Sequence, residues 1–272
     1  MVYRRMQSLA KEIERAALED LHEAASPELR AGLGIESRTI GTAFVSIASA
    51  LPASAIVINR AIGVGITAPE TEDTIREIVE AYRVAGVTRY FVQVHPDARP
   101  RQIGDWLREC GLERARGWQK FCRGRDPVPE PRTDLTIREI GPRDGAASAA
   151  ILSDAFDLGD EARPWLARLP ARDRWHIFMT FDGEAPAGTG ALFIDGDIAW
   201  TDFGATAPAF RRRGSQTALL RHRVKFALDH GCRQIFTCTG EAVPGDPQHS
   251  YSNILKAGFK EDYIRLNYAP PR

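Results

Sequence analysis

Apolar residues near the N-terminus recur at the spacing of a helix with one buried face. Leu9, Ile13, Ala17 and Leu21 lie four residues apart, and charged residues occupy many of the positions between them, as in an amphipathic helix. A secretory signal peptide instead needs an uninterrupted apolar segment. We therefore expect a helix that packs one side against the core, and no export of the chain.

The most apolar tract covers residues 43–58, where three serines and Pro52 interrupt the apolar residues. It falls short of the ~18 apolar residues that a membrane-spanning helix needs, so we expect no membrane partner. The tract predicts two strands that are joined by a turn at residues 51–53.

Each half of the chain ends with the same order of predicted elements. An amphipathic helix ends at a Gly, a strand follows at once, and a short helix and a closing strand complete the series. Such a comparison detects internal repeats. The elements are residues 71–86, 89–94, 105–112 and 118–123 in the first half, and 215–231, 233–239, 253–259 and 263–268 in the second.

The second half begins with further strands and helices. The pattern predicts a strand at 135–140, helices at about 143–156 and 161–169, and strands at 175–181, 187–194 and 198–204. Antiparallel hairpins followed by a β-α-β crossover give a mixed sheet with helices on both faces. The predicted fold class is α/β with mixed sheets of the α+β type: two tandem modules, each a mixed, mostly antiparallel sheet flanked by helices.

Length and a proline-rich segment indicate two domains. The chain has 272 residues, more than the ~100–150 of a typical single domain. Residues 125–134 contain three prolines at every second position, which favour an extended linker. We predict one domain at residues 1–126 and a second at residues 134–272.

Composition and charge narrow the class of protein. Lys+Arg and Asp+Glu both number 36, so the net charge gives no indication of a nucleic-acid partner. The 43% hydrophobic and 26% charged residues are typical of a globular protein. Cys110, Cys122, Cys232 and Cys238 show no CxxC spacing, so we expect reduced thiols, a cytoplasmic protein and no metal site.

The candidate chemistry lies in APAFRRRGSQTALL, residues 207–220. A predicted strand leads through a turn to three arginines, Gly214 and the start of a helix. The first amides of a helix lack intrahelical partners and attract anions, and Gly214 permits close approach of a ligand. Positive charge comes from Arg211, Arg212 and Arg213. The segment predicts a pyrophosphate site, with a solvated basic turn as the alternative.

This segment, with the strand before it and NILKAGF after it, resembles the GNAT superfamily of acetyl-CoA-dependent N-acetyltransferases. Arg211, Gly214 and Gln216 take the fixed positions of its signature Gln/Arg-x-x-Gly-x-Gly/Ala, although Gln216 replaces the small last residue. The resemblance covers most of residues 134–272, whereas residues 1–126 match only in the order of elements. It implies acetyl-CoA as co-substrate and direct transfer to a small-molecule or peptide amine.

The resemblance also implies which residues hold acetyl-CoA. Backbone amides of the loop bind the pyrophosphate, and the strand end pairs with the pantetheine arm. The amide of Gly204 is placed to stabilise the oxyanion of the tetrahedral intermediate. Asn253 is either a pantetheine contact or the N-cap of the last helix. The cofactor-binding residues are then Ala205, Thr206, Arg211, Arg212, Arg213, Gly214, Ser215, Gln216 and Asn253.

Groups that would move protons do not follow the family pattern. Many relatives have a Tyr that acts as the general acid at the position of Ile254. Some relatives have a carboxylate at the position of Trp200. Tyr251, one helical turn from Ile254, is a candidate acid, with a packing role as the alternative. Candidate bases, each with a structural or solvent-exposed alternative, are Asp202, Glu241 and His249. An ordered chain of waters is a further possibility.

The first half lacks the arginine-rich loop. Two glycines occur at the corresponding place, but the turn before the helix carries Glu70, Glu72 and Asp73. Carboxylates there suit the helix dipole and repel pyrophosphate. We therefore expect residues 1–126 to be a degenerate GNAT-like domain without a cofactor loop, which shapes the acceptor pocket or acts as an internal dimer partner.

Three functions are compatible with these patterns. The first is a cytoplasmic tandem-GNAT acyltransferase, either a monomer that is an internal pseudo-dimer or a homodimer. The second is a non-catalytic acyl-CoA-binding regulatory protein, which the missing acid at position 254 keeps open. The third is a structural protein without a ligand, and the three arginines beside Gly214 argue against it.

Overall fold

The computed structural model describes residues 2–130 and 132–272, with side chains from residue 9 onward. Pro131 of the expected linker lies outside the described residues. The helices are α1 (Val2–Glu23), α2 (Pro27–Leu33), α3 (Glu72–Val84), α4 (Ile103–Glu109), α5 (Gly145–Phe156), α6 (Arg163–Leu166), α7 (Ser215–Asp229) and α8 (His249–Lys256). The strands are β1 (Ile35–Ile40), β2 (Ala43–Ala48), β3 (Arg60–Val64), β4 (Phe91–Val94), β5 (Glu113–Arg123), β6 (Thr136–Glu139), β7 (Trp175–Asp182), β8 (Ala185–Asp195), β9 (Ile198–Thr206), β10 (Gln234–Gly240) and β11 (Lys260–Ala269).

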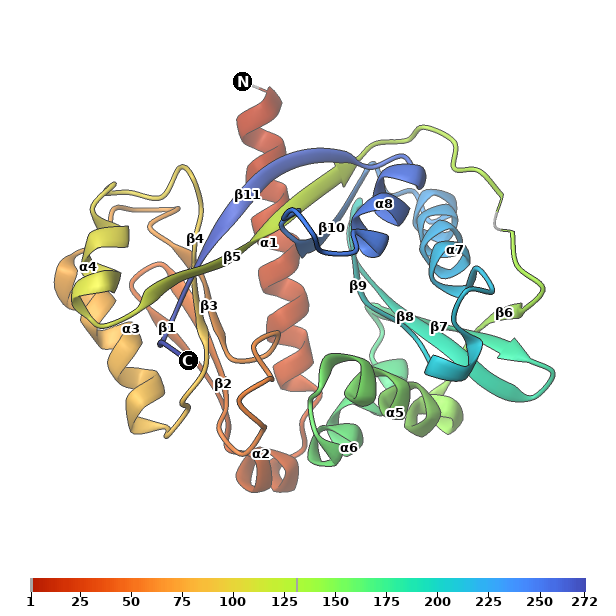
Figure 1. The fold of residues 1–272 in the computed structure, drawn as a ribbon, viewed down its shortest axis with the longest axis horizontal. Coiled ribbons are helices and arrows are strands. Elements are labelled where there is room, and N and C mark those ends of the chain that lie inside the picture. The colour runs from red at the N-terminus through yellow and green to blue at the C-terminus, as the bar shows by residue number, and fades with distance from the viewer. Residues whose placement is uncertain (1, 131) are drawn as a thin grey trace.

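The described strands form one mixed sheet in the order β1-β2-β3-β4-β11-β5-β10-β9-β8-β7-β6. The pairs β3·β4 and β9·β10 are parallel, and the other neighbours are antiparallel. Figure 1 shows α3 and α4 beside the first half of this sheet and α7 and α8 beside the second. The fold is thus α/β with a large mixed sheet flanked by helices, as predicted.

The two halves of the chain exchange their last strands. β5, from the first half, pairs antiparallel with β10 of the second. β11, from the second half, pairs antiparallel with β4 of the first. The two exchanged strands also pair with each other and cross between the halves (Figure 1). The linker at residues 125–134 divides the chain, but each half-sheet contains a strand from the other side of that division.

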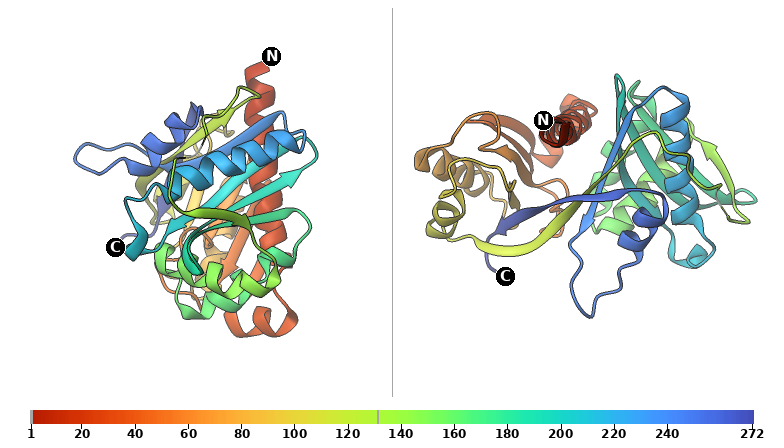
Figure 2. Two further views of the ribbon diagram at one scale, coloured as in Figure 1. Left: turned by 90° about the vertical axis from the view of Figure 1, so that its right-hand side faces the viewer. Right: turned by 90° about the horizontal axis from the view of Figure 1, so that it is seen from above.

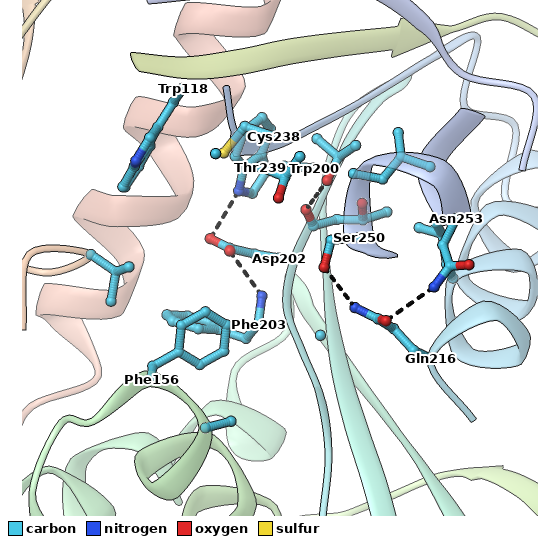
Figure 3. A pocket seen from close by; sticks show the side chains of 18 of the residues that line it. Trp118, Phe156, Trp200, Asp202, Phe203, Gln216, Cys238, Thr239, Ser250 and Asn253 are labelled. Carbon is cyan, nitrogen blue, oxygen red and sulfur yellow. Dashed lines mark hydrogen bonds between the residues drawn. The ribbon is translucent and has the colours of Figure 1, made fainter. Parts of the chain in front are cut away.

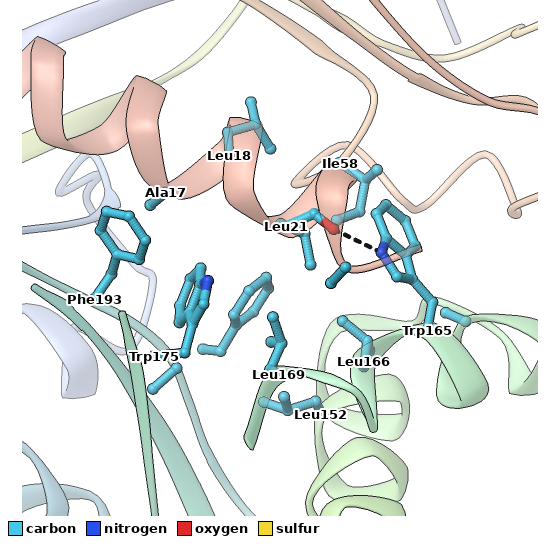
Figure 4. Packing of buried hydrophobic residues seen from close by; sticks show 14 of the residues in the cluster. Ala17, Leu18, Leu21, Ile58, Leu152, Trp165, Leu166, Leu169, Trp175 and Phe193 are labelled. Carbon is cyan, nitrogen blue, oxygen red and sulfur yellow. Dashed lines mark hydrogen bonds between the residues drawn. The ribbon is translucent and has the colours of Figure 1, made fainter. Parts of the chain in front are cut away.

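Helix α1 lies between the two half-sheets and joins their cores. Its buried residues Ala17 and Leu21 belong to one apolar cluster with Trp165 and Phe193 of the second half (Figure 4). Ile13 belongs to the same cluster. Trp165 donates its indole N–H to the carbonyl of Leu21 at 2.8 Å. From above, α1 is seen nearly end-on between the halves (Figure 2). The amphipathic helix is confirmed, and none of the described helices is long and apolar enough to cross a membrane.

One carboxylate of α1 binds cations from three strands. Glu14, only 1% exposed, accepts hydrogen bonds from Arg60 of β3 at 2.8 Å and Lys120 of β5 at 2.6 Å. Both terminal nitrogens of Arg265, on β11, donate to it at 2.6 and 2.8 Å. Burial alone raises the pKa of Glu14, but the three cations outweigh burial and hold that pKa well below its ordinary value of 4.5.

Most predicted elements are confirmed, but the apolar tract at 43–58 was partly misread. It contains one strand, β2, and the second predicted strand is wrong, since the chain turns until β3 begins at Arg60. The buried side chain of Asn59 explains the reversal, because its Oδ1 accepts the backbone N–H of Ala48 at 2.8 Å. Strand β1 was not predicted, and its four central residues are exposed.

We expect Glu14→Gln to lower the free energy of unfolding by about 3–5 kcal/mol, because buried cations lose their counter-charge. The folded-state pKa of Glu14 is depressed, so its contribution is present above about pH 4.5 and is lost as the pH falls below that value. The difference between wild type and Glu14→Gln should therefore shrink in acid.

The matched control is Glu19→Gln, because Glu19 pairs with Arg15 at the surface of the same helix. Exposed pairs contribute up to ~1 kcal/mol, so this variant should cost little at any pH. Denaturant titrations at neutral and acid pH measure both variants. Equal losses for the two would contradict the role given to Glu14.

Candidate active site

A cleft of about 440 Å³ lies between β9 and β10. These strands pair in parallel over only three residues each and then separate. The second half lines the cleft with β9, β10, α7 and α8, together with the end of α5 (Figure 3). The first half adds Ile56, Val57, Arg60 and Trp118. Both halves of the chain therefore build this one cleft.

Strand β9 carries a bulge where it lines the cleft. Phe203 and Gly204 together lie opposite the single residue Gly190 of β8. Phe203 has a φ of 48°, a left-handed conformation that costs a bulky residue on the order of 1–2 kcal/mol. Bulges of this kind re-aim backbone and side chains beside active sites. Gly204 lines the cleft as expected, whereas the role of Phe203 was not predicted, and no local sequence signal marks it.

Asp202 presents a carboxylate to the cleft beside the bulge. Its Oδ2 accepts the indole N–H of Trp200 at 3.0 Å, and its Oδ1 accepts the backbone N–H of Phe203 at 2.8 Å (Figure 3). The rings of Trp118 and Phe156 line the same part of the cleft. Asp202 thus presents to the cleft a carboxylate whose two hydrogen-bond donors carry no charge.

The predicted anion loop ends at the start of α7. Gly214 has a φ of 81° and no side chain caps the helix N-terminus, so its first amides keep their capacity to bind an anion. Arg211 and Arg212 are exposed there. Serine at position 215 is buried, and its hydroxyl pairs with that of Thr180 at 2.8 Å. The loop thus offers its backbone and two arginine side chains.

The side chain of Arg213 forms ion pairs with two carboxylates. Its guanidinium binds the carboxylate of Asp134 at 2.5 Å and that of Asp182 at 2.6 Å. Hydrogen bonds to these two carboxylates raise the pKa of Arg213. The guanidinium thus ties the loop to β7 and to the end of the linker, and a contribution of its charge to a pyrophosphate site stays a prediction.

Gln216 and Asn253 meet at the mouth of the cleft. The side chain of Gln216 donates to Ser250 and accepts from Asn253, both at 3.0 Å, and so links α7 to α8 (Figure 3). Asn253 lies inside α8, whose N-cap is Gln248, so the N-cap interpretation of Asn253 is wrong. Both side chains line the cleft, where the family signature has a small residue in place of Gln216.

The strand end beyond the bulge lies at the edge of the cleft. Ala205 and Thr206 continue β9 and pair with Thr189 and Gly188 of β8. Their side chains do not line the cleft. Any contact that these two residues make with a cofactor would therefore come from their backbone.

Tyr251 does not line the cleft. Its hydroxyl donates to the carboxylate of Glu261, and its ring packs edge-on against Phe121, with 5.0 Å between the ring centroids. Burial and the contact with Glu261 raise the pKa of Tyr251 to about 12. This geometry agrees with the packing alternative, while a role as acid stays a prediction.

The other two candidate bases also lie outside the lining of the cleft. The Oε2 of Glu241 accepts the backbone N–H of Gly117 at 3.1 Å, and the backbone N–H of Glu241 donates to the Gly117 carbonyl at 2.8 Å. Glu241 thus fastens the end of β10 to β5. His249 is exposed at the first residue of α8. Among the three candidates, only Asp202 faces the cleft.

The first half satisfies its own loop with a carboxylate. Glu70, 6% exposed, accepts the backbone N–H of Thr42 at 2.7 Å and makes a longer contact with that of Gly65 at 3.4 Å. The helix that follows, α3, is capped by Thr71, which accepts the N–H of Thr74 at 3.2 Å. The loop between β3 and α3 therefore carries an internal anion at the place that precedes α7 in the second half.

Within residues 2–130 and 132–272, no group of three or more His, Cys, Asp and Glu side chains is arranged to hold a metal ion. The polar groups of the cleft include one carboxylate, two buried guanidinium groups, the thiol of Cys238, amides and hydroxyls. This donor set suits acid–base and acyl chemistry.

The parallel strands β9 and β10 of the mixed sheet thus part beside a bulge, and the helix that follows β9, α7, begins without a side-chain cap. Residues 149–245 match the model of the acetyltransferase (GNAT) family. This part of the chain is therefore similar to the GNAT family. No curated protein matches the chain significantly.

Three solved structures share the fold. A GCN5-related N-acetyltransferase from Kribbella flavida is 15% identical over 97% of this chain and 96% of that chain, with a TM-score of 0.63. A functionally unknown conserved protein from Staphylococcus epidermidis is 9% identical over 91% and 98%, with a TM-score of 0.60. A tandem GNAT protein from the clavulanic acid biosynthesis pathway is 16% identical over 72% and 68%, with a TM-score of 0.53.

We expect Gly214→Ala to destabilise the fold more than Gly231→Ala does. Both glycines have a φ above 80°, but a Cβ on Gly214 would lie 2.6 Å from the Arg132 carbonyl oxygen, whereas a Cβ on Gly231 meets nothing within 4 Å. Backbone strain should cost about 1 kcal/mol in each, and the clash about 1–3 kcal/mol more in Gly214→Ala. Denaturant titrations measure the difference, and equal losses would show that the loop adapts freely.

Proposed function

We propose that the protein is an acetyl-CoA-dependent N-acetyltransferase that moves the acetyl group directly to a small-molecule or peptide amine in a ternary complex. The observation that carries the proposal is that three features line one cleft. They are the bulge of β9, the carboxylate of Asp202 and one face of α7, the helix whose N-terminus is uncapped. A GNAT-family domain supplies the general reaction.

In this proposal the loop before α7 holds the pyrophosphate of acetyl-CoA. The backbone amides of residues 212–216 donate to the phosphate oxygens, and Arg211 and Arg212 add charge. Arg213 acts indirectly, since its ion pairs with Asp134 and Asp182 fix the loop. The backbone of residues 204–206 and the amide of Asn253 bind the pantetheine arm, which requires the Gln216 side chain to keep or exchange its bond to Asn253.

Acetyl-CoA supplies a thioester activated for attack by an amine. The amide of Gly204, in the bulge, stabilises the negative charge that develops on the carbonyl oxygen. Asp202 takes the proton of the incoming ammonium group, directly or through one water. A thiolate is a good leaving group, since a thiol such as that of Cys has a pKa of only about 8.5, so the reaction does not depend on Tyr251 as acid.

The first half takes part as a wall of the acceptor site. Residues 1–126 form the GNAT-like domain without a cofactor loop, and Glu70 already accepts the backbone N–H groups of Thr42 and Gly65 there. Its turn residues Ile56 and Val57, together with Arg60 and Trp118, line the same cleft as Asp202. The exchange of β5 and β11 supports an internal pseudo-dimer within one chain, with a homodimer of such chains as the alternative.

A second candidate function is a non-catalytic acyl-CoA-binding regulatory protein. Its support is the hydroxyl of Tyr251, which is engaged by Glu261 away from the cleft. Release of thiol from acetyl-CoA, measured across a panel of small amines, amino acids and peptides, distinguishes the two functions. Turnover with any acceptor excludes a purely regulatory role.

Acetyl-CoA should raise the melting temperature of the protein. At about 100 times its dissociation constant, a ligand that binds only the folded state adds ~2.7 kcal/mol. Replacing both Arg211 and Arg212 by Glu should remove most of this shift, because the loop then repels phosphate. Glu72→Lys, at the start of α3, is the control and should leave the shift intact. A chain that acetyl-CoA does not stabilise would have no cofactor site.

Asp202→Asn should lower kcat/KM for the amine about 10²- to 10⁴-fold, because the amide cannot accept the proton. The acetyl-CoA shift should persist, since the side-chain oxygen of Asn can still accept the N–H of Phe203, although its NH2 group cannot accept the N–H of Trp200. Tyr251→Phe is the control and should react at the wild-type rate. A full rate in Asp202→Asn would remove Asp202 from the mechanism, and a lost rate in Tyr251→Phe would restore that residue.

A further inference from the structure

The first half contains a second, smaller cavity of about 100 Å³. Residues of α1, β3, β4 and β11 line it, and it shares no lining residue with the cleft. Its exposed lining residues, Glu12 and Thr67, mark the opening. A cavity of this size holds a few waters or one molecule of a few non-hydrogen atoms.

His95 contributes a neutral donor to this cavity. Its Nδ1 accepts the backbone N–H of Asp97 at 2.9 Å, which places the ring proton on Nε2. Burial, with Lys11, Arg265 and Lys120 nearby, lowers the pKa of His95 to about 3, so the ring is neutral at ordinary pH. Nε2 has no hydrogen-bond partner among the described residues, although the side chain is only 4% exposed.

Three more buried groups at the cavity lack partners within the described part of the chain. They are the hydroxyl of Tyr263, the Nε–H of Arg265 and the Oε1 of Gln93. The other atoms of these groups are engaged, since Arg265 uses both terminal nitrogens on Glu14 and Gln93 donates to Asn267 at 2.8 Å. Folded proteins leave few buried polar groups unsatisfied. Three donors and one acceptor around one cavity therefore indicate a polar occupant.

The charges of the buried side chains favour an occupant that is negatively charged. Arg60, Lys120 and Arg265 share the single carboxylate of Glu14, so buried positive charge exceeds negative charge. At the opening, Lys11 and Glu12 carry opposite charges, and the carboxylates of Asp97 and Asp262 also lie near the Lys11 ammonium group. An anion in the cavity reduces the buried excess, whereas a further cation increases it.

We propose that this cavity binds a short 2-hydroxycarboxylate. The N–H groups of His95 and Arg265 and the hydroxyl of Tyr263 donate to its carboxylate, and the Oε1 of Gln93 accepts its hydroxyl. An amino acid of the same size is disfavoured because its ammonium group adds positive charge. This site does not depend on the proposed acetyl transfer, because the two cavities are separate.

Isothermal titration calorimetry of the full chain with glycolate, acetate and glycine tests the proposal. Glycolate should bind, acetate should bind about tenfold more weakly because it lacks the hydroxyl, and glycine should be the weakest. Tyr263→Phe should weaken glycolate binding about tenfold and keep the fold, since the hydroxyl it removes has no partner. Tyr90→Phe alters a buried tyrosine of the same half outside the cavity and should leave the affinity unchanged.

A second variant tests the proposal even if Tyr263→Phe does not fold. Gln93→Glu places a fixed carboxylate at the cavity and should abolish glycolate binding by charge repulsion. No heat with any of the three probes would mean that the cavity holds only solvent and would overturn the proposal. Equal glycolate affinity in wild type and in Tyr263→Phe or Gln93→Glu would overturn it as well.

Discussion

The relative placement of the two halves depends on the buried carboxylate of Glu14. Its partners lie on β3, β5 and β11, and the last two are the strands that cross between the halves. A buried charge shared by three cations is strongly destabilising when one partner is displaced, so α1 and the exchanged strands favour a single arrangement. The cluster also positions one wall of the cleft, because the guanidinium of Arg60 stacks 5.1 Å from the ring centroid of Trp118.

The two halves treat the same backbone feature in opposite ways. In each, a parallel strand leads through a loop to a helix whose first amides lack helical partners. In the first half Thr71 caps α3 by accepting the N–H of Thr74, and the carboxylate of Glu70 beside it accepts the N–H groups of Thr42 and Gly65. In the second half, the carboxylates of Asp134 and Asp182 bind the guanidinium of Arg213 instead of the first amides of α7. This difference explains why we assign a cofactor to only one of two similar modules.

Periodicity predicted the helices and most strands, because their apolar faces are encoded locally, as at Ile75 and Ile78 of α3. It could not predict the strand exchange, since β5 and β11 present the same alternation to either half-sheet. The loop motif located the start of α7, but the partners of Arg213 are 31 and 79 residues away in the chain. The first-half residues of the cleft, such as Val57, follow only from the tertiary fold, because the turn that carries them resembled a strand.

The strain at Phe203 connects the candidate base to the candidate oxyanion site. A left-handed Phe persists only where its surroundings compensate for the cost, and here its ring is 5% exposed and its N–H is bound by the carboxylate of Asp202. The same carboxylate therefore holds the bulge that contains Gly204 and faces the space where an amine would enter. Because one side chain sets both positions, the distance between the base and the oxyanion donor is fixed by the backbone of β9 and does not require a loop to close.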